Sequence, residues 1–87
     1  MYSLEYSTQA KKFIKGLDKH ILIRIMGRLE NLEKNPHPSD AKFIGRGQNN
    51  EKTFRYRIGD YRALYKVKEP EQVVLIAKID KRPRVYK

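Results

Sequence analysis

Residues 53–67 read Thr-Phe-Arg-Tyr-Arg-Ile-Gly-Asp-Tyr-Arg-Ala-Leu-Tyr-Lys-Val. Aromatic or apolar residues largely alternate with basic ones on both sides of Gly59-Asp60, which is typical of half-buried strands. A Gly-Asp dipeptide between two such runs favours a two-residue turn. The segment therefore predicts a β-hairpin with strands at 53–58 and 61–67.

This turn fixes which residues of the hairpin face each other. Counting outward pairs Ile58 with Tyr61 and Arg57 with Arg62, and then Tyr56 with Ala63, Arg55 with Leu64 and Phe54 with Tyr65. Successive side chains of a strand point to opposite faces. One face is therefore expected to hold Phe54, Tyr56, Ile58, Tyr61, Ala63 and Tyr65. The other is expected to hold Arg55, Arg57 and Arg62, with Leu64 beside them, and we call it the arginine face.

Stability alone does not explain the arginine face. Like charges directly opposite on a sheet destabilise it by roughly a few tenths to 1 kcal/mol. The planar guanidinium group matches the oxygens of a phosphate, so three clustered arginines predict a phosphate-binding site. The alternative is that the arginines point into water or pair with Glu69, Glu71 or Asp80.

The rest of the chain predicts two helices and three more strands. Residues 2–6 alternate as a short strand, and Ser7 or Thr8 can begin a helix with its apolar stripe at Ala10, Phe13, Ile14 and Leu17. Asp18 can begin a second helix that Asn35-Pro36 ends. Its apolar stripe comprises Ile21, Leu22, Ile25, Met26, Leu29 and Leu32. The short connection between the helices predicts an antiparallel helical hairpin.

Residues 36–51 are rich in Pro, Gly, Asn and Asp and predict a loop, with a short strand at 42–44. Residues 72–80 predict a further strand. The expected fold is α+β: an N-terminal strand, then an antiparallel helical hairpin packed on a twisted antiparallel β-meander. At 87 residues, the chain is expected to form one domain, 1–87.

Composition narrows the class of protein. The chain has no cysteine, 34% charged residues and a net charge of +10. Residues 52–87 hold eleven basic and four acidic residues, so most of the excess lies in the C-terminal part. Such a surface suits an anionic partner such as nucleic acid. No apolar run is long enough to span a membrane and no signal peptide is evident, so we expect a cytoplasmic protein that needs no membrane.

The C-terminal segment adds a second basic group. Residues 80–87 read Asp-Lys-Arg-Pro-Arg-Val-Tyr-Lys, so Lys81, Arg82 and Arg84 precede Tyr86. A nucleobase can stack on a tyrosine ring while a phosphate contacts an arginine. If the preceding strand directs this segment to the arginine face, Arg82 and Tyr86 would extend the site, and Lys81 and Arg84 would bind RNA.

Two segments together resemble the RelE/ParE toxin superfamily, and its RelE branch in particular. They are Phe-Arg-Tyr-Arg-Ile-Gly-Asp-Tyr-Arg-Ala-Leu-Tyr at 54–65 and Lys-Arg-Pro-Arg-Val-Tyr at 81–86. The resemblance implies a toxin of a type II toxin–antitoxin system that cleaves mRNA in the ribosomal A site and inhibits translation. It also implies an acidic, RelB-like antitoxin that wraps around the toxin, with the ribosome and mRNA as further partners.

The resemblance implies a catalytic group as well. Arg55, Arg57, Arg62, Arg82 and Tyr86 stand where the family surrounds the scissile phosphate. Arg55 and Arg57 replace the lysines of a well-studied pattern. Because arginine is effectively always protonated, Arg57 is a poor general base. The residues therefore favour catalysis by charge stabilisation and positioning, which can supply much of a barrier.

Other chemistries find little support in the sequence. His20 and His37 lie outside the arginine face, which disfavours a paired-histidine mechanism. Carboxylates are dispersed, so neither a metal nor another cofactor is expected. Three alternatives stay open: a ParE-like inhibitor of DNA gyrase, an RNA-binding module without catalysis, and a degenerate toxin.

Overall fold

The structure, a computed structural model, describes residues 1–81 apart from the side chain of Gln48. Two helices, α1 (Thr8–Lys15) and α2 (Lys19–Glu30), follow the first strand, β1 (Ser3–Tyr6). Four more strands come after them: β2 (Ala41–Arg46), β3 (Lys52–Ile58), β4 (Tyr61–Lys68) and β5 (Val73–Lys81). Within residues 1–81, no helix is both long and apolar enough to cross a membrane.

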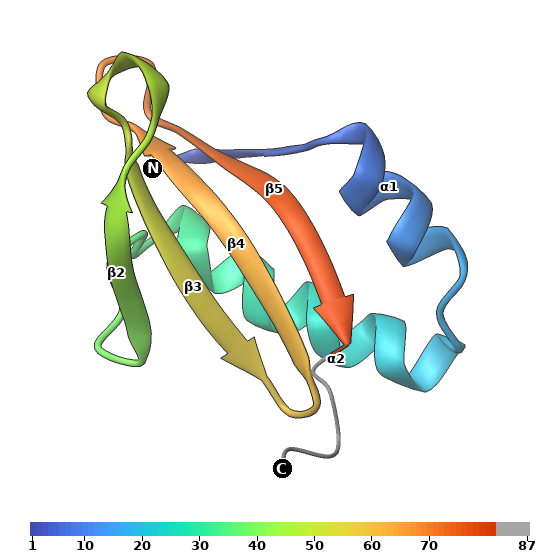
Figure 1. The fold of residues 1–87 in the computed structure, drawn as a ribbon. Helices are drawn as coiled ribbons and strands as arrows, with labels where there is room; N and C mark the ends of the chain where they lie inside the picture. The colour runs from blue at the N-terminus through green and yellow to red at the C-terminus, as the bar shows by residue number, and fades with distance from the viewer. Residues whose placement is uncertain (82–87) are drawn as a thin grey trace, which may run out of the picture.

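The five strands form one sheet in the order β1-β5-β4-β3-β2, and α2 crosses behind it (Figure 1). Strands β3, β4 and β5 make the expected antiparallel meander, and β2 pairs antiparallel with β3. The first strand, β1, pairs parallel with β5. The α+β fold, its N-terminal strand, its helical hairpin and its meander are thus confirmed, and the N-terminal strand forms a parallel edge of the sheet.

The hairpin between β3 and β4 has the predicted register. Ile58 pairs with Tyr61, Arg57 with Arg62 and Phe54 with Tyr65. Gly59 in the turn has a φ of 59°, a conformation that glycine adopts without a steric penalty. All six residues expected on the covered face are buried, and Tyr65 and Ala63 are wholly inaccessible to solvent.

The core lies between this covered face and the helices. Ala10 of α1, Ile25 and Leu29 of α2, and Leu32 pack against Val67, Val74, Ile76 and Ile79 of the sheet. Phe13 of α1 meets Tyr61 edge-on, with 6.0 Å between ring centroids. Because α1 and α2 both lie on this side, neither of the described helices covers the arginine face of the sheet.

Some element boundaries differ from those predicted. The second helix ends at Glu30 and tightens into a 3-10 turn at Asn31–Glu33, well before Pro36. Leu32, assigned to the helical stripe, is buried from this turn. Strand β2 is longer than expected, and a bulge between Phe43 and Gly45 leaves Ile44 as its extra residue.

Two side chains close the edge of β5 where β1 ends. Ser7, whose hydroxyl caps α1 by accepting from the Ala10 amide at 3.1 Å, donates to the carbonyl of Ala77 at 2.7 Å. The Gln9 amide donates to the carbonyl of Ile79 at 3.1 Å and accepts from the Ile79 amide at 3.0 Å. Gln9 thus continues the ladder of β5 in the way that a neighbouring strand would.

Candidate functional site

The arginine face is built from three neighbouring strands. Arg55 and Arg57 lie on β3 and Arg62 lies on β4, directly opposite Arg57. Asp80 of β5 is the next residue across from Arg62. Arg57 is exposed, while Arg55 and Arg62 are partly buried. The structure therefore brings together three of the five predicted catalytic residues.

The face is strongly cationic beyond these three residues. Strand pairing and alternation place seven basic residues on it: Lys42, Arg55, Arg57, Arg62, Lys66, Lys68 and Lys78. They also place two acidic residues there, Glu5 and Asp80. Adjacent strands lie about 4.8 Å apart, so these charges reinforce one another over a short distance.

The acidic residues that the sequence suggested as partners of the arginines do not form ion pairs with them. Asp80 forms an ion pair with Lys78 at 3.5 Å, and Glu71 is exposed at the turn before β5. Across residues 1–81, none of the three arginines forms an ion pair with another described side chain. Their guanidinium groups are thus available to bind an anion.

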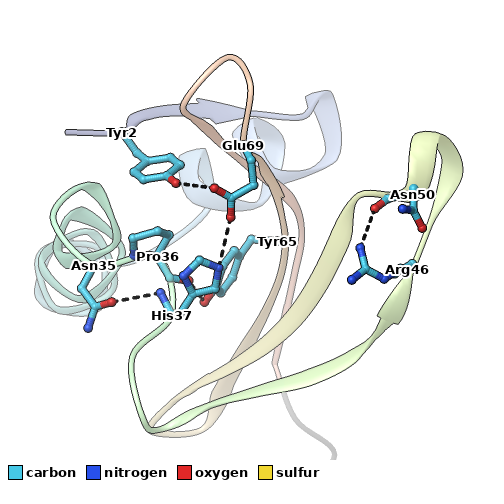
Figure 2. Close-up of polar contacts among 8 residues, drawn as sticks. All are labelled: Tyr2, Asn35, Pro36, His37, Arg46, Asn50, Tyr65 and Glu69. Carbon is cyan, nitrogen blue, oxygen red and sulfur yellow. Dashed lines mark hydrogen bonds and ion pairs between the residues drawn. The ribbon is translucent and has the colours of Figure 1, made fainter.

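Glu69 belongs to a polar cluster at the other end of the sheet (Figure 2). One carboxylate oxygen accepts from the Tyr2 hydroxyl at 2.8 Å, and the other lies 3.5 Å from Nε2 of His37. The hydrogen bond to Glu69 raises the pKa of the Tyr2 hydroxyl. The His37 ring meets Phe54 edge-on, on the covered side of the sheet. Through Glu69, this cluster joins the residue before β1 and the loop before β2 to the turn between β4 and β5, and His37 lies away from the arginine face.

The predicted C-terminal residues have separate outcomes. Lys81 is the last residue of β5 and pairs with Tyr61, so alternation places it on the covered face rather than beside Arg62. Arg82, Arg84 and Tyr86 lie outside the described residues. Their roles, like those of Arg55, Arg57 and Arg62, remain predictions.

Arg28 of α2 supports the strand end that carries Arg57, a role that was not predicted from the sequence. Its Nη2 donates to Asp40 Oδ2 at 2.8 Å and, over a longer 3.4 Å, to the backbone carbonyl of Arg57. Its Nε donates to the Tyr56 hydroxyl at 3.3 Å, with the guanidinium 4.9 Å above the Tyr56 ring. Arg28 thus joins α2 to the strand end that carries Arg57.

The placement of Arg28 had one signal in the sequence. It lies three residues after Ile25 and directly before Leu29, at the border of the apolar stripe of α2. An arginine at such a border buries its stem and reaches across the neighbouring element with its head. Its partners are 12 to 29 positions away, so sequence alone did not identify them.

Side chains that could bind a metal ion together do not cluster among the described residues. Residues 1–81 contain no group of three or more His, Cys, Asp or Glu side chains that could hold a metal ion. The pKa values that clearly depart from their usual range belong to Tyr2, Tyr6 and Tyr65, on the covered side or at its edge. The charged groups of the arginine face are mainly Lys and Arg side chains, which can bind and stabilise an anion.

Known proteins share this fold and this sequence pattern. The family model described as the ParE toxin of the type II toxin–antitoxin system parDE matches residues 4–86. The chain belongs to this toxin family. The match spans both segments on which the resemblance to the RelE/ParE superfamily rests, and it includes residues 82–86.

Relatives of this toxin carry the RelE name. The RelE1 protein of Methanocaldococcus jannaschii is 29% identical, with 99% of this chain and 96% of that protein covered. The archaeal RelE–RelB complex from Pyrococcus horikoshii contains a chain with 29% identity and a TM-score of 0.83, covering 97% of this toxin and 98% of that chain. In the Mycobacterium tuberculosis toxin–antitoxin complex RelBE2, the corresponding values are 27% and 0.74, with 93% and 98% covered. The toxin is thus of the RelE type, and the predicted resemblance is confirmed.

Proposed function

We propose that this toxin is a ribosome-dependent endoribonuclease that cleaves mRNA in the A site and so stops translation in the cytoplasm. The observation that carries the proposal is the arginine face, where Arg57 lies opposite Arg62 with Arg55 beside them. Three guanidinium groups without carboxylate partners among the described residues suit an anion with several oxygens. The scissile phosphate of RNA is such an anion.

The reaction is attack of the 2′-OH on the adjacent phosphate. The bond between the 2′ oxygen and phosphorus forms, the bond to the 5′ oxygen breaks, and the proton lost from the 2′ oxygen is balanced by one gained at the 5′ oxygen. Arg55, Arg57 and Arg62 would hold the phosphate and neutralise the negative charge that develops on it. Arg82 would stabilise the transition state, and Tyr86 would orient a base or assist proton transfer.

The ribosome has a chemical role in this proposal. Arginine is a poor general base, so the described residues supply electrostatic stabilisation rather than proton transfer. An enzyme of this kind depends on precise placement of the 2′-OH in line with the leaving oxygen, which positioning by the ribosome can provide. The proposed mechanism uses no metal ion. If the toxin cleaves a short RNA in the absence of ribosomes, we therefore expect EDTA to leave the rate of that cleavage unchanged.

The partner proposed for this toxin is an acidic antitoxin. Two similar solved structures are complexes of RelE with RelB or of RelBE2. The seven basic residues of the arginine face favour an acidic segment as the inhibitor. Such a segment would inhibit the toxin by covering Arg55, Arg57 and Arg62, or by displacing the segment that contains Arg82 and Tyr86.

The test is mRNA integrity in a translating extract, mapped by primer extension. The wild-type toxin is compared with Arg62→Ala and Arg82→Ala. Arg46→Ala, at the end of β2 farthest from the turn between β3 and β4, controls for the loss of one guanidinium. We expect cuts that require ribosomes, a 5′-hydroxyl on the downstream fragment, loss of cutting in the two site variants, and retained cutting in the control. Circular dichroism verifies that each variant is folded.

Other outcomes would lead to different functions. Growth arrest with intact mRNA would favour inhibition of DNA gyrase, the alternative associated with the ParE branch. RNA binding without cleavage would indicate a binding module or a degenerate toxin. Unchanged cleavage in Arg62→Ala would remove the arginine face from the site.

A further inference from the structure

Leu64 is an apolar side chain surrounded by four basic ones. On β4 it lies between Arg55 of β3 and Lys78 of β5, its partners in the sheet. Arg62 and Lys66 lie two residues away along β4 and therefore share its face. Because strands lie about 4.8 Å apart and same-face residues about 6.7 Å apart, all four cations border this one leucine.

The core does not explain the leucine at this position. Leu64 is partly buried, but it lies on the face opposite the helices and is not among the residues packed against the core. A glutamate here could pair with any of its four neighbours and would relieve their mutual repulsion. The chain instead places an aliphatic surface at the centre of a cationic ring.

We infer that Leu64 forms the floor of a nucleobase subsite on the arginine face. One base of the RNA packs on the leucine side chain, while its flanking phosphates contact the surrounding cations. This inference rests on the proposed function and deepens it, since it assigns the place of a base next to the scissile phosphate. A nucleotide is the ligand that combines a flat, weakly polar surface with an anion at this spacing.

The chain provides a matched control in Leu75. This leucine lies on the same face and is also partly buried, on β5. Its neighbours across the sheet are Lys66 on one side and Glu5 on the other, so the charges beside it are opposite in sign. Leu75 therefore tests whether a partly buried leucine on this face is sufficient, or whether the ring of four cations is needed.

The experiment measures binding of a short, fluorescent 2′-O-methyl oligouridylate to the purified toxin, without ribosomes. The 2′-O-methyl group prevents cleavage, and a second oligonucleotide of equal length lacks its bases. We expect Leu64→Ala to weaken binding of the base-bearing oligonucleotide roughly fivefold without changing the slope of affinity against salt. Binding of the abasic oligonucleotide should not change, and Leu75→Ala should bind both as the wild type does.

A second variant protects the test against misfolding. Leu64→Phe presents a larger flat surface on which a base can stack, so we expect it to bind the base-bearing oligonucleotide more tightly than the wild type. Equal weakening of both oligonucleotides by Leu64→Ala would overturn the inference, because the leucine would then only position the cations. Wild-type protein that does not distinguish base-bearing from abasic RNA would overturn it as well.

Two further outcomes separate this inference from neighbouring ones. If Leu64→Ala changes only the binding of an acidic peptide, the leucine belongs to a protein interface and the subsite is refuted. If the difference between the two oligonucleotides holds while the translating extract shows no cleavage, the subsite stands and the proposed nuclease function fails.

Discussion

The hydroxyl of Tyr65, in the middle of β4, donates a 2.7 Å hydrogen bond to the backbone carbonyl of Pro36 (Figure 2). The tyrosine is fully buried, and its ring stacks on Phe54 with 5.3 Å between centroids. This contact fastens the loop before β2 to the centre of the covered face, which lies directly behind the arginine face.

Tyr65→Phe should therefore destabilise the protein by about 1–2 kcal/mol, because the buried carbonyl of Pro36 loses its donor. Urea denaturation measures the loss. Tyr61→Phe is the matched control, since the Tyr61 hydroxyl forms no hydrogen bond with any residue in 1–81 and should change stability much less. Equal effects of the two substitutions would show that the Pro36 contact contributes nothing specific.

The same tyrosine predicts a loss of stability at alkaline pH. Burial raises the pKa of Tyr65 well above its usual range, and burial likewise raises the pKa of Tyr6. Above about pH 10, the unfolded chain has lost protons that the folded protein still holds, so folding stability falls as pH rises. Urea midpoints measured from pH 9 to 11 should fall more steeply for the wild type than for Tyr65→Phe.

Removing one of the paired arginines should stabilise the fold and impair function together. Arg57→Thr removes one charge of the like-charge pair, leaves Arg62 opposite an uncharged residue, and should stabilise the protein by a few tenths to about 1 kcal/mol. The same variant should lose cleavage in the translating extract, whereas Arg57→Lys, which keeps the charge, should show no gain in stability. A destabilised Arg57→Thr would mean that this arginine serves the fold.

Gln9→Glu should weaken the edge of β5 in a pH-dependent way. When ionised, the new carboxylate still accepts from the Ile79 amide but faces the Ile79 carbonyl without a proton to donate. We expect a loss of about 1–2 kcal/mol at pH 7, with recovery below about pH 4 relative to the wild type at the same pH. A loss that does not vary with pH would argue against the paired bonds.

The hairpin could be predicted from the sequence residue by residue. A two-residue turn leaves one register, and alternation then assigns every side chain to a face, so Arg57 opposite Arg62 followed by counting. Helix α1 and its Ser7 cap followed from local signals of the same kind. These features depend on residues close together in the chain, where geometry leaves few alternatives.

Features that depend on distant residues could not be predicted in this way. The parallel pairing of β1 with β5 depends on which sheet edge remains free after the helices pack, which the sequence of 2–6 does not encode. Lys81 was grouped with the basic residues that follow it, although alternation from Asp80 turns it to the other face. Glu69 was a candidate partner of the arginines, but Tyr2 and His37 bind it instead.

The pairing of β1 with β5 also affects how the chain folds. Strand β1 pairs with β5, about 70 residues later in the chain, and the Ser7 hydroxyl donates to the carbonyl of Ala77, 70 positions away. Such long-range closure slows folding, and α2 exposes its apolar stripe until β4 and β5 emerge. A chain that lacks β5 therefore leaves both β1 and one edge of β4 without their partners.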